Sequence, residues 1–193
     1  MTLLDAVSRA VKVASAEHCT AVLVGGLAVS ARAEPRFTRD ADLVIAIDTD
    51  SHAEFVIRSF ITQGYRLQAV LEQSGVGRLS GARLVDPEGF EVDLLTASSG
   101  IEAEIVADAD EIDIVPGLSL HVAAIGHLIA LKLLSVAPGR ETDAADLRAL
   151  AEVADRSEWD RAVAAVELIT ERGFNRGRDL MGDLIALRST ITE

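Results

Sequence analysis

Apolar residues recur along this chain with two periods, one typical of helices and one typical of strands. Residues 2–17 place apolar side chains three and four positions apart, which predicts an amphipathic helix. Short apolar runs at 21–24 and 43–47 are bounded by Gly, Asp and Thr and predict buried strands. The predicted strands cover residues 20–24, 40–47, 65–72, 78–85, 90–95, 112–115 and 118–122. The predicted helices cover residues 2–17, 27–33, 51–62, 123–136, 142–154, 157–171 and 179–187.

This order, a mixed sheet first and helices last, predicts an α+β or α/β fold with helices flanking the sheet. We expect residues 1–122 to form the core, including the N-terminal helix, and residues 123–193 to form a helical C-terminal subdomain. The crevice between these two parts is then the expected ligand site.

Several local patterns refine this prediction. Ser51 and Glu54 have the spacing of a capping box and predict the start of a helix. The run Asp-Pro-Glu-Gly at 86–89 predicts the turn of a hairpin. The acidic segment 102–113 predicts a solvated loop, with a surface for a basic partner protein as the alternative. His127 lies on an apolar helix, which favours a packed core histidine over a metal ligand.

The composition is that of a globular protein with a core built from aliphatic residues. Hydrophobic residues make up 49% of the chain, but aromatic residues only 4%. No apolar run approaches the roughly 20 residues that a membrane helix requires, so we expect no membrane association. The N-terminal segment carries charges throughout and does not resemble a signal peptide. Cys19, the single cysteine, cannot form an internal disulfide, and together these features favour a cytoplasmic protein.

The charge distribution argues against broad affinity for nucleic acid. The net charge is −13, whereas non-specific binding depends on neutralising phosphates. A local basic patch stays compatible with this charge, because Arg32, Arg36 and Arg39 lie close together. The chain has only two lysines, Lys12 and Lys132.

Two acidic residues and two glycines carry the candidate chemistry. Asp40 and Asp42 are two positions apart at the start of a predicted strand, so their side chains share a face. Such a pair favours a divalent cation, since magnesium takes carboxylate and phosphate oxygens. Gly25 and Gly26 follow a strand and leave backbone N–H groups open to a phosphate. The alternative is that the aspartates merely cap a turn.

These residues resemble the nucleotidyltransferase superfamily of the DNA polymerase beta type, whose motif is GG followed by D-x-D on a strand. Within it, Thr38-Arg39-Asp40-Ala41-Asp42-Leu43 is similar to the AbiEii and MenT-like toxins of bacterial toxin–antitoxin systems. Gly25-Gly26, the spacing and the aspartate pair carry the resemblance jointly.

Asp93 is the candidate third carboxylate. It lies on an apolar predicted strand, where an acidic side chain needs a partner. The resemblance implies that it ligates metal with Asp40 and Asp42, and that such a carboxylate can act as a general base. Glu91 shares its face and is a possible substitute, and an exposed edge position for Asp93 is the other alternative.

Lys132 is the one permanent charge on an apolar predicted helix. It either extends to the helix edge or contacts an anion. The resemblance implies that it contacts the triphosphate, and that Asp143 or Asp146 orients this lysine or the substrate. Asp143 and Asp146 share a helix face, and the sequence leaves the choice between them open. Capping of the helix start is the alternative for Asp143.

Ser30, Arg32, Arg36 and Arg39 are further candidates for binding phosphate. Arginine suits bidentate phosphate contacts, so Arg36 and Arg39 could hold a triphosphate or an acceptor RNA. A small serine that only packs is as good an interpretation for Ser30, and solvation is the alternative for the arginines.

The resemblance implies a magnesium-dependent enzyme, with manganese as a possible substitute, that moves a nucleoside monophosphate from a nucleoside triphosphate to an acceptor hydroxyl. It also implies a toxin with a cognate antitoxin and the 3′ end of a tRNA as acceptor, while a protein hydroxyl stays open. Two alternatives remain: a non-catalytic nucleotide-binding or antitoxin-like module, and an aminoglycoside-type small-molecule nucleotidyltransferase.

Overall fold

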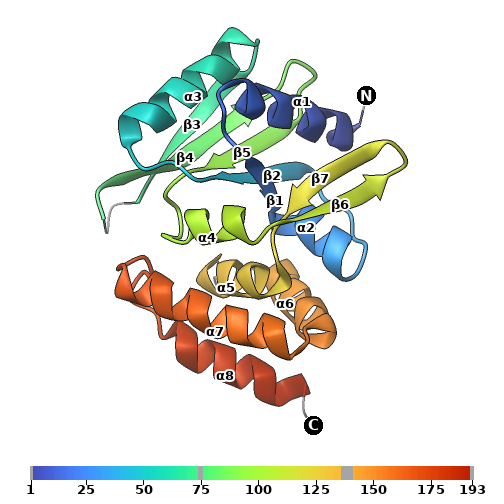
Figure 1. Ribbon diagram of the computed structural model, residues 1–193, viewed down its shortest axis with the longest axis vertical. Coiled ribbons are helices and arrows are strands. Elements are labelled where there is room, and N and C mark those ends of the chain that lie inside the picture. Colours follow the sequence, from blue (N-terminus) through green and yellow to red (C-terminus); the bar gives the residue numbers. More distant parts are fainter. Residues whose placement is uncertain (1, 74–75, 136–140, 192–193) are drawn as a thin grey trace.

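The computed structural model describes residues 2–73, 76–135 and 141–191. Within these residues, a seven-stranded mixed sheet has the order β3-β4-β5-β2-β1-β7-β6 (Figure 1). The strands are β1 (Ala21–Val24), β2 (Asp40–Ile45), β3 (Arg66–Gln73), β4 (Arg78–Val85), β5 (Glu91–Leu95), β6 (Asp110–Val115) and β7 (Leu118–Val122). The helices are α1 (Leu3–Ala16), α2 (Gly25–Arg32), α3 (Asp50–Thr62), α4 (Glu102–Ala107), α5 (Ile125–Ser135), α6 (Glu141–Val153), α7 (Arg156–Glu171) and α8 (Leu180–Ile191). The predicted fold class is confirmed.

The sheet mixes both strand directions. At its centre β2 runs antiparallel to β1 and parallel to β5, while β1 runs parallel to β7. The antiparallel pairs β3–β4 and β6–β7 form the two ends. Helices α1 and α3 contact each other and one side of the sheet, whereas α2 and α4 pack against β1 and β2. Figure 1 shows α5 to α8 as a layer beyond α2 and α4.

Local hydrogen bonds explain where several elements begin. Thr2 and Asp5 form a capping box at the start of α1. Asp86 Oδ1 accepts hydrogen bonds from the backbone N–H groups of Glu88 and Phe90, both at 2.9 Å. This side chain therefore fixes the predicted turn between β4 and β5, which sets the register of the hairpin.

Two local predictions were wrong. Helix α3 is capped by Thr49, whose side chain accepts from His52 N, so it begins before the predicted capping box of Ser51 and Glu54. The acidic segment 102–113 is not a solvated loop but contains α4 and most of β6. Its apolar residues alternate with the acidic ones and pack on the core, and Glu102 is itself buried.

Other predictions hold or lie outside the described residues. His127 is 3% exposed, as expected for a core histidine. The predicted stop of the helix at Pro138 and Gly139 lies outside the described residues. The hydrophobic core is continuous across residue 122, and the division of the chain at that point stays a prediction. Within the described residues, no helix is both long and apolar enough to cross a membrane.

Candidate active site

Three carboxylates from adjacent strands lie on one face of the sheet. Asp40 and Asp42 are on β2, and β5 runs parallel to it with Asp42 directly opposite Asp93. Residues paired in this way project to the same side, and residues two apart on β2 share that side. The structure thus brings Asp40, Asp42 and Asp93 together. Glu91, the alternative to Asp93, lies opposite Asp40, two residues earlier on the same two strands.

The carboxylates lie beside the bend at Gly25. This glycine has a φ of +64°, and a Cβ atom placed on it would lie 1.8 Å from Oδ2 of Asp42. A Cβ on Gly26 would lie 2.5 Å from Nη2 of Arg36. Both glycines are the first residues of α2, so they let charged side chains approach the N-terminus of this helix.

The crowding of carboxylates shifts the titration of Asp42. Burial, followed by the charges of Asp40 and Asp93, raises the pKa of Asp42 to about 7, although the cations Lys132 and Arg83 oppose this shift. Asp40 accepts a hydrogen bond from the Thr38 hydroxyl at 2.8 Å. A cation bound between Asp40 and Asp42 would relieve the repulsion, so the pair has the electrostatic character of a metal site.

Both carboxylate oxygens of Asp93 accept hydrogen bonds from one arginine, Arg83. Nε of Arg83 donates to Oδ1 of Asp93 at 2.8 Å, and Nη2 donates to Oδ2 at 2.6 Å. Among the described residues, no three histidine, cysteine, aspartate or glutamate side chains converge as a ready-made metal site. Asp40 and Asp42 therefore fit a magnesium ion that takes its other ligands from phosphate and water, and Asp93 does not complete the set as it stands.

Lys132 lies at the centre of a buried ion network. Its Nζ atom lies 2.8 Å from Oδ1 of Asp143 and 2.7 Å from Oδ2 of Asp146. Arg36 pairs with Asp146 from the other side, with Nε at 2.6 Å from Oδ1. Both aspartates are buried and both contact the same lysine, so the choice of functional carboxylate between them stays open.

A cleft of about 440 Å³ collects these groups. It is lined by the two glycines, by the three carboxylates of the sheet, and by Arg83 and Lys132, together with residues of α5 and α6. Asp146 contacts this lining through Lys132 without lining the cleft itself.

Three predicted phosphate-binding residues, Ser30, Arg32 and Arg39, do not line the cleft. The Ser30 hydroxyl lies 3.1 Å from the carbonyl oxygen of Gly26 and accepts from Arg36 N at 3.2 Å, so it holds the segment after α2. Arg39 is exposed, and its guanidinium lies 5.8 Å from the ring centre of Phe37. Arg32 donates to Asp110 and to backbone oxygens at the end of β7. The geometry gives Ser30 and Arg32 structural contacts.

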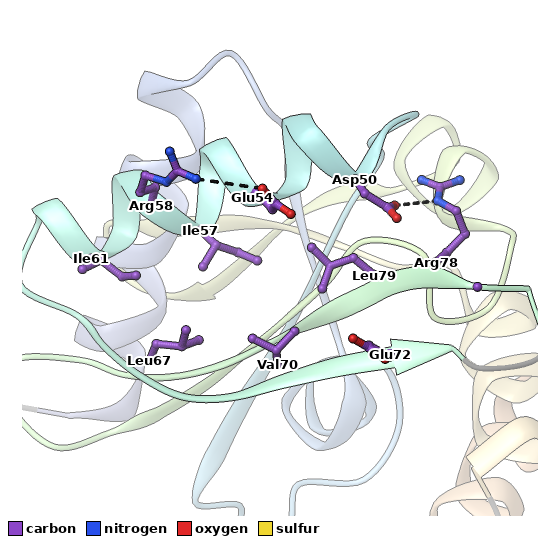
Figure 2. A pocket seen from close by; sticks show the side chains of 11 residues that line it. Asp50, Glu54, Ile57, Arg58, Ile61, Leu67, Val70, Glu72, Arg78 and Leu79 are labelled. Atoms are coloured by element: carbon purple, nitrogen blue, oxygen red, sulfur yellow. Dashed lines mark hydrogen bonds and ion pairs between the residues drawn. The ribbon is translucent and has the colours of Figure 1, made fainter.

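A second cavity of about 480 Å³ lies between α3 and the strands β3 and β4 (Figure 2). Four of its charged side chains form two pairs: Asp50 lies 2.6 Å from Arg78, and Glu54 lies 3.9 Å from Arg58. Glu72 also lines the cavity. Figure 2 shows Leu67 and Val70 of β3 on the floor of this cavity, below Ile57 and Ile61 of α3. It lacks the crowded carboxylates of the first cleft, which is therefore the better candidate for chemistry.

Sequence reasoning missed Arg83 and undervalued Arg36. The predicted hairpin turn contained the information for Arg83, because a turn at 86–89 places residue 83 opposite residue 93. Arg36 was one of several arginines without a distinguishing pattern. Its role depends on Asp146, which is 110 positions away in the sequence.

Comparisons with known proteins agree with the fold and the motif. The family model described as the nucleotidyl transferase AbiEii toxin of type IV toxin–antitoxin systems matches residues 8–191. No curated protein sequence matches the chain.

Solved structures of low sequence identity share the fold. The antibiotic-resistance factor ANT(2″)-Ia has a TM-score of 0.52 at 14% identity, covering 98% of this chain and 90% of that chain. An antigenic nucleotidyltransferase-like protein from Paracoccidioides brasiliensis has a TM-score of 0.52 at 18% identity, with coverages of 95% and 92%. The lincosamide antibiotic adenylyltransferase LnuA, bound to lincomycin, has a TM-score of 0.51 at 16% identity, with coverages of 77% and 96%.

The family match extends over nearly the whole chain and includes the glycine bend, the aspartate pair and Lys132. It confirms the resemblance that these motifs carried. The chain therefore belongs to the AbiEii family of nucleotidyltransferase toxins of type IV toxin–antitoxin systems.

Proposed function

We propose that this protein transfers a nucleoside monophosphate from a nucleoside triphosphate to an acceptor hydroxyl, with magnesium, or manganese in its place, bound by Asp40 and Asp42. The observation that carries the proposal is the contact of Asp42 with the bare Cα of Gly25. This contact joins a carboxylate pair that favours a cation to a helix N-terminus that favours phosphate.

The triphosphate would lie along the start of α2. Gly25 and Gly26 line the cleft as the first two residues of α2. The first N–H groups of a helix have no partner within it, and no side chain of these residues intervenes. Lys132 supplies a positive charge on the opposite wall, within the electrostatic reach of Asp42. A phosphate tail between these two groups would be neutralised from both sides.

Asp143 and Asp146 then act as positioning residues. They hold the ammonium group of Lys132 at 2.8 and 2.7 Å, and Arg36 balances the second aspartate. The lysine is thereby kept in one orientation before substrate arrives, which lowers the cost of ordering it on binding.

The reaction is a displacement at the α-phosphorus atom. The acceptor oxygen forms a bond to this phosphorus, and the bond to the oxygen that bridges to the β-phosphate breaks. Pyrophosphate leaves, and the proton of the hydroxyl passes to water. A bound magnesium ion would supply stabilisation of the charge on the phosphate oxygens.

The 3′ end of a tRNA is the acceptor that we propose, in keeping with the toxin family. Phe37 is 80% exposed in the segment that leads into Asp40, and Arg39 lies against its ring. An exposed aromatic ring with an adjacent guanidinium suits stacking of an unpaired base. This local surface can bind RNA despite the net charge of −13. A cognate antitoxin is the partner that the family implies.

The test uses α-³²P-labelled nucleoside triphosphates, one base at a time, with magnesium and with separate pools of tRNA, protein and aminoglycosides. We expect label to move to tRNA and pyrophosphate to accumulate. Asp42→Asn should abolish the transfer, whereas Asp48→Asn, an exposed aspartate beyond the end of β2, should leave it unchanged. Undiminished transfer by purified Asp42→Asn would rule out this site.

The same assay separates the alternatives. A small-molecule nucleotidyltransferase would label the aminoglycoside pool and leave tRNA unlabelled. A non-catalytic binding module would bind triphosphates in calorimetry, with or without magnesium, and would label none of the pools.

A further inference from the structure

A row of three charges crosses the sheet at one level. Arg83 on β4 pairs with Asp93 on β5, and Asp93 pairs with Asp42 on β2. The neighbour of Asp42 on the next strand is Val24, the residue that precedes the glycine bend. Across the sheet, the order is therefore the guanidinium of Arg83, the carboxylate of Asp93 and the carboxylate of Asp42.

The contact between Arg83 and Asp93 uses both oxygens of the carboxylate. The two donor–acceptor distances, 2.8 and 2.6 Å, are those of a bidentate pair. Asp93 is 7% exposed, so the pair is shielded from solvent on the carboxylate side. A guanidinium stays protonated in proteins, which makes this charge permanent.

The pair changes the number of carboxylates that can bind metal. A site with three free carboxylates can hold two divalent cations close together. Here Asp40 and Asp42 have no arginine partner among the described residues, while Asp93 has both oxygens engaged. Arg83 already supplies the positive charge that a second metal ion would bring to Asp93.

We propose that the guanidinium of Arg83 replaces a second metal ion at Asp93, so that the site binds a single divalent cation through Asp40 and Asp42. This inference rests on the proposed function, since it concerns the same cleft. Arg83 is a positioning residue in this account: it holds Asp93 and keeps a fixed positive charge beside the reacting phosphate.

The interpretation that the pair only stabilises the hairpin makes a different prediction. Neighbouring cross-strand pairs, such as Leu84 with Val92 and Ala82 with Leu94, are apolar and buried, so the hairpin has stabilising contacts without the ion pair. A purely structural pair would alter the free energy of unfolding when removed and would not alter the number of metal ions bound.

The experiment counts manganese ions. Mn²⁺ retained by the protein is measured by equilibrium dialysis in the presence of inorganic tripolyphosphate, which mimics the phosphate tail without a base. Binding to the Asp40→Asn/Asp42→Asn variant is subtracted as background from the acidic surface. We expect one ion per wild-type protein, one for Asp93→Asn with an affinity within about twofold, and two for Arg83→Leu.

The matched control is Arg78→Leu, which removes an arginine from the same strand whose partner is Asp50, outside the cleft. It should bind one ion. Two ions on the wild-type protein, with one lost in Asp93→Asn, would overturn the inference and leave the proposed function intact. No ion above background on the wild type would contradict the proposed function itself. One ion on folded Arg83→Leu would also overturn the inference. If Arg83→Leu does not fold, Arg83→Gln, which removes the charge and keeps a side-chain donor, is counted in its place.

Discussion

At the scale of single residues, the cleft brings negatively charged carboxylates close together, and they repel each other. Asp42 is surrounded by Asp40 and Asp93, and its pKa rises because burial and like charges disfavour the ionised form. Such strain at one residue is unfavourable for folding and favourable for binding a cation. We therefore expect the folded protein to become more stable when the carboxylate of Asp42 is removed.

The first prediction concerns Asp42→Asn in the metal-free protein. Because the folded-state pKa of Asp42 is about 7 and the ordinary value is 3.8, the folded protein holds this proton more tightly than the unfolded chain does. The contribution of Asp42 to the free energy of unfolding thus falls as pH rises from about 4 to about 7, and the full penalty persists above that pH.

We therefore expect Asp42→Asn to be more stable than the wild type at pH 8, on the order of 4 kcal/mol, and nearly equal to it at pH 4. Urea denaturation with EDTA present measures both values. A variant that is less stable at pH 8 would show that Asp42 is stabilised by contacts rather than crowded by charge.

The second prediction concerns Gly25→Ala. A Cβ atom here would overlap Oδ2 of Asp42, and the φ of +64° is unfavourable for alanine. We expect nucleotidyl transfer to fall by at least about 100-fold, because a displacement of about 1 Å in a catalytic group has an effect of that order. Gly89→Ala has a comparable φ of +92° and open space around it, so it controls for backbone strain alone. Equal activity of the two variants would contradict this role for Gly25.

At the scale of elements, three helices meet over the cleft through one ion network. Arg36 follows α2, Lys132 is on α5, and Asp143 and Asp146 are on α6. The network attaches the C-terminal helices to the segment beside the aspartate pair. It also holds the ammonium group of Lys132 in the lining of the cleft, where we propose that the phosphates bind.

The third prediction compares the two lysines of the chain. Lys132→Met should destabilise the protein by about 3–5 kcal/mol, because it leaves Asp143 and Asp146 buried without their shared cation. It should also abolish detectable triphosphate binding in calorimetry. Lys12→Met, an exposed lysine on α1, should alter neither property. Unchanged triphosphate binding by folded Lys132→Met would exclude Lys132 from the phosphate site.

The elements themselves were largely predictable from periodicity, because burial imposes it on the sequence. The strand with Asp40 and Asp42 was predicted because an apolar run follows this pair, and the strand with Asp93 because apolar residues flank it. The acidic segment 102–113 was wrongly predicted to be a loop because its charge suggested full solvation. Ile112 and Ile114 alternate with acidic residues along β6 and pack on the core, which is the pattern of a strand. Partners distant in sequence, such as Arg36 and Asp146, leave no local pattern.

At the scale of the whole molecule, the sheet and the C-terminal helices share one core. Buried residues from α1 to α8 form a single connected cluster, and α2 contacts both α5 and α6. The family and fold followed from a short motif, because the chemistry of a triphosphate demands that motif. The acceptor leaves no comparable motif, since any hydroxyl can attack.

The fourth prediction uses two natural probes. Trp159, the single tryptophan, is 6% exposed on α7, and Tyr65, the single tyrosine, is 4% exposed beside β3. Because one core spans both, we expect their fluorescence changes and the far-ultraviolet circular dichroism to give one coincident urea transition. Separate midpoints for the two probes would mean that residues 1–122 and 123–193 unfold as independent units.

The most direct test of the account is a single-turnover measurement of pyrophosphate release with tRNA and each nucleoside triphosphate. With magnesium, the wild-type protein should release one pyrophosphate for each nucleotide attached to tRNA. EDTA should stop the release, as should Asp42→Asn, while Asp48→Asn should leave it unchanged. Release that continues in EDTA, or at the wild-type rate in Asp42→Asn, would contradict the claim that this aspartate pair binds the catalytic cation.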